Sequence, residues 1–71
     1  MPSSVISRFD YDADHTALDV TFVSGHRYRY YQVPPLLAER FRRAASKGQF
    51  FNLRIRDRFD YRELIGGRRD N

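Results

Sequence analysis

The sequence predicts an α+β domain in which a three-stranded antiparallel β-meander is followed by two short helices packed on one face. Two observations lead to this prediction. Apolar and polar side chains alternate over residues 18–22 and again over residues 26–30, which is the period of a half-buried strand. After a pair of prolines, apolar side chains recur at helical spacing from residue 37 onward.

The first expected strand runs from Val5 to Tyr11, with Val5, Phe9 and Tyr11 on a broken apolar face. It ends in the turn-rich segment at residues 12–15. The second strand places Leu18, Val20 and Phe22 on one face and stops at Ser24-Gly25, which favours a two-residue hairpin turn.

The third expected strand is the Arg-Tyr alternation at residues 26–30. Tyr28 and Tyr30 share one face, and Arg27, Arg29 and Tyr31 share the other. Because so small a sheet needs one face that is apolar and buried, we expect the two tyrosines to lie on the side of Leu18 and Val20, in the core.

Pro34 and Pro35 end the sheet, and a helix is expected over residues 35–45 with Leu37 and Phe41 on its apolar face. Ser46 and Gln49 have the spacing of a capping box for a second helix. Residues 49–56 also fit a strand with alternate residues inward, and the helix is the preferred interpretation.

The chain has 71 residues, so residues 1–64 are expected to form a single domain and residues 65–71 a flexible C-terminal tail. Cysteine is absent, so stability must come from packing, to which an aromatic content of 15% contributes. The sequence shows neither an apolar segment of membrane-spanning length nor a signal peptide, and the expected location is the cytoplasm.

Charge is distributed unevenly along the chain. The formal net charge is +4 and the sequence pI is about 10.0. Residues 1–25 carry a net charge of −3, whereas residues 26–71 carry +7. An excess of arginine over most of the chain favours a polyanionic partner such as RNA.

Basic residues alternate with aromatic residues over residues 27–31, and a second basic run over residues 47–58 flanks Phe50 and Phe51. Basic residues interleaved with aromatic residues are typical of surfaces that bind single-stranded nucleic acid. The expected function is therefore a non-enzymatic module that binds nucleic acid, with RNA as the first candidate. A protein-protein interaction module, acting by self-association or by docking to a partner protein, is the alternative. The expected nucleic-acid-binding residues are Arg27, Arg29, Tyr31, Lys47, Arg54 and Arg56.

Catalytic, metal and cofactor sites are not expected. Asp10, Asp12 and Asp14 have the spacing of a calcium loop, but the required glycine and glutamate positions hold His15 and Thr21. The two histidines lie outside any recognised nucleophile or metal pattern. The aspartates are therefore interpreted as a solvated acidic turn.

Several short motifs together resemble one family. Ser3-Ser4-Val5-Ile6, the strand at residues 18–22, Tyr28-Arg29-Tyr30, Ala45-Ser46-Lys47-Gly48 and Phe50-Phe51-Asn52 occur in the order typical of the KTSC domain. This short domain is found at the C-terminus of some lysyl-tRNA synthetases and in stand-alone bacterial proteins. The resemblance implies no established activity, and RNA binding has been suggested for the family.

Overall fold

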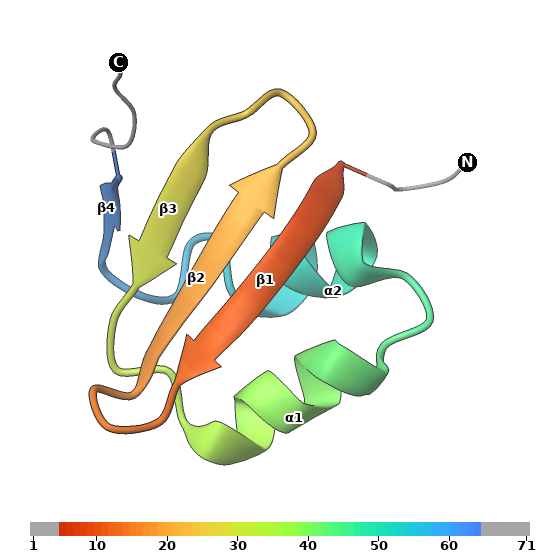
Figure 1. The fold of residues 1–71 in the computed structure, drawn as a ribbon. Helices are drawn as coiled ribbons and strands as arrows, with labels where there is room; N and C mark the ends of the chain where they lie inside the picture. Colours follow the sequence, from red (N-terminus) through yellow and green to blue (C-terminus); the bar gives the residue numbers. More distant parts are fainter. Residues whose placement is uncertain (1–4, 65–71) are drawn as a thin grey trace.

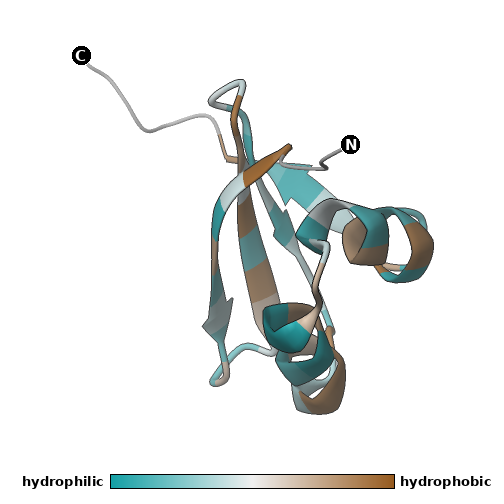
Figure 2. Ribbon diagram, turned by 90° about the vertical axis from the view of Figure 1, so that its right-hand side faces the viewer, coloured by the Kyte–Doolittle hydropathy of each residue, from teal (hydrophilic) through white to brown (hydrophobic). Residues whose placement is uncertain are grey.

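The structure is a computed structural model that describes residues 5–64. Both helices lie on one face of a single antiparallel sheet, and no helix of residues 5–64 covers the opposite face (Figures 1 and 2). The α+β class is as predicted, and the expected tail at residues 65–71 lies outside the described part. The elements along the chain are β1 (Ile6–Asp12), β2 (Ala17–Phe22), β3 (Arg27–Tyr30), α1 (Pro35–Arg43), α2 (Lys47–Arg54) and β4 (Tyr61–Glu63).

Over residues 5–64 the sheet has four strands in the order β1-β2-β3-β4, so the prediction of a three-stranded meander is wrong by one strand. β4 pairs with β3, and a backbone hydrogen bond lies at each end of the paired segment. Tyr31 N–H donates to Asp60 O, and Leu64 N–H donates to Arg27 O. β4 has only three residues, all of them exposed. Such a segment has no alternation of burial, and its pairing depends on a strand some 30 residues earlier.

A register shift in β1 changes which side chains face the core. The shift falls between Ile6 and Arg8, opposite the end of β2. Ile6, Phe9 and Tyr11 therefore pack against the core, while Val5 is 47% exposed. The expected inward position of Val5 is wrong because a bulge breaks the strict period of two.

The turn between β2 and β3 has three residues rather than the expected two. Phe22 N–H donates to His26 O, and Gly25 N–H donates to Phe22 O, which encloses residues 23–25. Gly25 adopts a φ of 99°, in the region that side chains with a Cβ rarely enter. A three-residue loop with glycine at this position is a common hairpin connection.

Both helices begin where the sequence predicts them, and α1 ends at Arg43 rather than at residue 45. α1 starts with Pro35 in its first turn, and it buries Ala38 and Phe41 against the sheet. α2 begins after Ser46, whose side chain accepts a hydrogen bond from Gln49 N–H at 3.3 Å. Residues 49–54 are therefore helical and not the alternative strand.

The core lies between the helices and the inner face of the sheet, the face that the helices cover (Figure 2). Tyr30 is 4% exposed, and Tyr28 is half-buried and packs against the core. The predicted inward orientation of both tyrosines is confirmed. The buried core residues are Leu18, Val20, Tyr30, Val33, Phe41, Phe51 and Ile55. Among residues 5–64, no helix combines the length and the apolar character that a membrane crossing requires.

Candidate functional site

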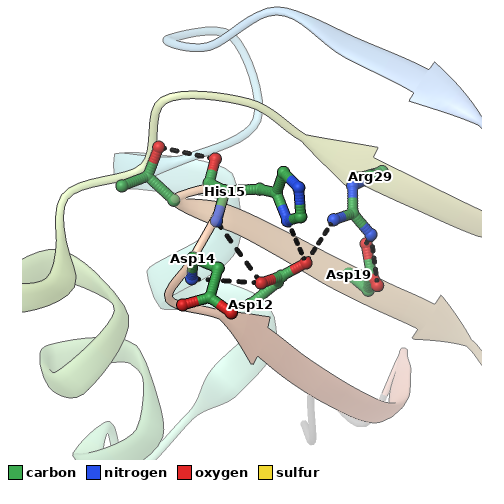
Figure 3. A network of polar contacts seen from close by, with 6 residues as sticks. Asp12, Asp14, His15, Asp19 and Arg29 are labelled. Carbon is green, nitrogen blue, oxygen red and sulfur yellow. Dashed lines mark hydrogen bonds and ion pairs between the residues drawn. The ribbon is translucent and has the colours of Figure 1, made fainter.

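The outer face of the sheet, opposite the helices, carries carboxylates on β1 and β2 beside arginines on β3. Asp19 of β2 is the register partner of Arg29 of β3. Arg29 donates hydrogen bonds to both Asp19 oxygens, at 3.1 and 3.0 Å, and a third to Asp12 Oδ2 at 2.8 Å (Figure 3). These contacts neutralise much of the Arg29 charge within the protein.

Asp12 joins this network to the turn that follows β1. Its Oδ1 accepts hydrogen bonds from the backbone N–H groups of Asp14 and His15, and its Oδ2 accepts one from His15 Nδ1 at 2.8 Å (Figure 3). The side-chain hydrogen bond from His15, aided by the one from Arg29, lowers the pKa of Asp12. The acidic turn expected from the sequence therefore also orients an arginine.

The other two predicted residues of this strand differ in their surroundings. Arg27 is exposed on the outer face, and no carboxylate among residues 5–64 forms a salt bridge with it. Tyr31 is half-buried just beyond β3, where its backbone N–H is bonded to Asp60 O. Only Arg27 thus presents an unpaired charge on the outer face at this strand.

The remaining predicted residues belong to α2 and to the segment that follows it, on the other side of the sheet. Lys47 Nζ donates to Ala44 O at 2.9 Å, so it helps to close the turn before α2. The Arg54 guanidinium lies 5.9 Å from the centroid of the Phe50 ring. Arg56 is exposed and lines a pocket. The six predicted residues are therefore divided between the two sides of the sheet and do not form one surface.

The pocket next to Arg56, which we call the aromatic pocket, has a volume of about 540 Å³ and lies between α2 and the inner face of β3 and β4. Its apolar lining includes Phe22, Tyr28, Tyr30, Phe51 and Tyr61, and its polar lining includes His26, Asn52, Arg56 and Asp57.

The rings of this pocket support one another through direct ring contacts. Tyr61 packs against Tyr28 with centroids 5.7 Å apart and against Tyr30 at 5.4 Å. Phe51 packs edge-on against Phe22 at 5.4 Å and against Tyr30 at 5.3 Å. Tyr61 is still 58% exposed, so the pocket has at least one ring that solvent or a ligand can reach.

Burial within this cluster changes the acidity of Tyr30. Desolvation, with smaller contributions from Tyr61 and Tyr28, raises the pKa of Tyr30 to about 12. The phenol is therefore neutral at physiological pH and acts as part of the wall.

The histidine that lines this pocket contacts a carboxylate of β4. His26 Nδ1 lies 2.8 Å from Glu63 Oε2, so β4 holds the imidazole of the residue that precedes β3. The His26 ring also stacks on Tyr28 with centroids 6.5 Å apart. This pair restrains one side of the aromatic pocket.

Sequence reasoning predicted only Arg56 among the residues that line this pocket as a binding residue. Phe22, Tyr28 and Tyr30 have a detectable signal, because their alternation places them on one face; for the two tyrosines this pattern favours core and leaves contact with a ligand open. Tyr61 had no such signal, because it lies in a three-residue strand without alternation.

The fold and these features define a small α+β domain with a charged outer sheet face and an aromatic pocket beside its helices. The chain belongs to the KTSC domain family, whose family model matches residues 2–59.

Known proteins similar to this chain include both isolated domains and parts of larger enzymes. A crystal structure of a KTSC domain protein from Yersinia pestis superposes with a TM-score of 0.81 and 36% identity, covering 90% of this chain and 93% of that one. A lysine–tRNA ligase of Nostoc punctiforme is 41% identical over 61 residues, which is 86% of this chain but 11% of the ligase. An uncharacterized protein of Stutzerimonas stutzeri is 38% identical over 52 residues, covering 73% of each chain.

Proposed function

We propose that this domain is a non-enzymatic module that binds single-stranded RNA, with the aromatic pocket receiving a base. The observation that carries the proposal is the partly exposed Tyr61 ring, which shares the pocket with Arg56. An aromatic face stacks on any base, and a guanidinium beside it neutralises a phosphate. The proposal includes the cytoplasmic location expected from the sequence.

The charges of the described residues support a choice between the two sides of the sheet. Arg29 on the outer face is already bonded to Asp19 and Asp12. Arg56 has no salt bridge to any carboxylate of residues 5–64, although Asp57 lines the same pocket. A phosphate at Arg56 therefore displaces no existing salt bridge, whereas a phosphate at Arg29 competes with two carboxylates.

The wall of the pocket supports base binding in a second way. Tyr28 and Tyr30 contact the Tyr61 ring, and Phe51 packs against Tyr30. A ring that is already held by its neighbours loses little conformational freedom when a base stacks on it. Three of the relatives are named lysine–tRNA ligase, and that name includes an RNA substrate, which agrees with the proposal.

The test is the binding of a short fluorescent single-stranded RNA, measured by fluorescence anisotropy over a series of salt concentrations. We expect the affinity to fall steeply with salt. Tyr61→Ala should weaken binding roughly 5- to 150-fold, because stacking on one aromatic ring contributes about 1–3 kcal/mol. Arg56→Ala should reduce the salt slope by about one, which corresponds to one phosphate contact.

Arg40→Ala is the matched control for Arg56→Ala, because Arg40 is also exposed and its loss changes the net charge equally. Arg27→Ala tests the outer face in the same way. The proposal is wrong if no RNA binds at low salt, or if Arg40→Ala or Arg27→Ala weakens binding as much as Arg56→Ala. Electrophoresis of the RNA after incubation checks the non-enzymatic part, since an intact strand is expected.

A further inference from the structure

β1 is an outer strand of the sheet, and one of its edges faces no other strand among residues 5–64. At seven residues it is the longest of the described strands, whereas β4 at the opposite edge has three. Proteins usually protect such edges with proline, an inward charge, a bulge or a very short strand, and the bulge of β1 lies near its beginning, before Phe9. β1 contains no proline, and its inward residues Phe9 and Tyr11 are aromatic.

The hydrogen-bonding pattern shows which backbone groups of β1 point outward. Phe22 N–H donates to His26 O, so alternate residues of β2 counted from Phe22 bond to β3. The intervening residues of β2 bond to β1, and their register partners there are Arg8, Asp10 and Asp12. Phe9 therefore directs its backbone N–H and C=O away from the sheet, as does Tyr11.

Opposite charges flank Phe9 on the outer face of this edge. Arg8 Nη2 and Asp10 Oδ2 lie 3.9 Å apart, and the two side chains are 72% and 74% exposed. A pair this exposed contributes little within one chain. When two such strands align antiparallel with Phe9 opposite Phe9, each Arg8 lies across from the partner's Asp10.

The inner side of the edge is apolar and also accommodates a second copy. Phe9 is half-buried and packs against Phe41 with centroids 4.7 Å apart. Beside it, a groove of about 570 Å³ between β1 and α1 is lined by Ala38, with Glu39 and Arg42 among its polar residues. The groove thus presents an apolar surface together with positive and negative side chains, which suits contact with a second copy of the chain.

We propose that β1 pairs antiparallel with β1 of a second copy, about a two-fold axis at Phe9, so that two four-stranded sheets join into one. The occupant we infer is a second copy rather than a foreign peptide, because the Arg8-Asp10 pattern complements itself under this symmetry. A foreign strand would use the same outward backbone groups but would not depend on this charge match. The interface is small, so the association is weak and depends on concentration.

The test is sedimentation equilibrium of the full chain over a wide concentration range, with charge variants at the two flanking positions. Arg8→Asp places like charges opposite each other on both sides of the axis, and so does Asp10→Arg. Each variant alone should weaken dimerisation about tenfold or more. An equimolar mixture of the two should restore it, because one strand then carries two carboxylates and the other two guanidinium groups.

The double variant R8D/D10R, with the charges exchanged, should dimerise like the wild type. Far-UV circular dichroism checks that every variant folds, which is expected because both side chains are exposed. Amide exchange gives a second readout, since the Phe9 N–H should be protected only in the dimer. The proposal is overturned if the wild type is monomeric at all concentrations, or if the mixture associates no better than the single variants.

Discussion

Arg29 and Asp19 lie directly opposite each other on β3 and β2, and the guanidinium bonds both carboxylate oxygens. A third hydrogen bond from Arg29 reaches Asp12 at the end of β1, so one side chain joins three strands. This arginine was a candidate RNA contact in the sequence, and the structure shows that its charge has two partners within the domain. We therefore expect its main contribution to be to stability.

Replacing Arg29 tests this role directly. Arg29→Met should lower the free energy of unfolding by about 1–3 kcal/mol, because two partly buried carboxylates lose charged hydrogen-bond donors. The measurement is urea unfolding followed by circular dichroism. Arg27→Met is the matched control on the same strand and should change stability by no more than about 0.5 kcal/mol. Equal losses in the two variants would contradict a structural role for Arg29.

Asp12 should make the domain sensitive to acid. Its hydrogen bonds, first from His15 and then from Arg29, lower its pKa from the ordinary value of 3.8. The unfolded chain therefore takes up a proton at higher pH than the folded one, so this stabilisation is present above pH 3.8 and is lost as the pH falls through the folded pKa.

Asp12→Asn should thus be less stable than the wild type at neutral pH, and the difference should shrink in acid. Urea unfolding at a series of pH values from neutral to strongly acidic measures both effects. Asp14→Asn is the control, because Asp14 contributes a backbone N–H rather than its carboxylate to the network. A difference between wild type and Asp12→Asn that does not vary with pH would show that the carboxylate charge is not responsible.

Tyr30 should make the domain lose stability as the pH rises, whereas Asp12 makes it lose stability as the pH falls. Burial raises its pKa to about 12 from 10.0, so above pH 10 the unfolded chain loses a proton that the folded chain retains. The stabilisation is complete below pH 10 and falls by about 2–3 kcal/mol as the pH rises to 12.

Tyr30→Phe should lack this part of the loss of stability at high pH. The measurement is the free energy of unfolding between pH 9 and pH 12 for wild type and variant, with Tyr31→Phe as a control that retains the loss contributed by Tyr30. If wild type and Tyr30→Phe lose stability in parallel over this range, burial of the phenol is not the cause.

Local patterns in the sequence predicted most of the fold because each depends on neighbours along the chain. The alternation in β2 and β3 decided which side chains form the core, and the Ser46-Gln49 spacing decided where α2 begins. The pair of prolines marked the start of α1 in the same way. Two of the failures, Val5 and the hairpin turn, came where a single extra residue interrupts the regular period.

The sequence by itself determined the α+β class, the inner face of the sheet and the excess of basic residues, because these follow from composition and short-range periodicity. Only the tertiary structure decided that Arg29 is neutralised by Asp19 and Asp12, that β4 exists, and that Tyr61 and Arg56 share a pocket. The physical reason is that these features depend on contacts between segments distant along the chain. The charge pattern cannot indicate which guanidinium meets a carboxylate until the strands are paired.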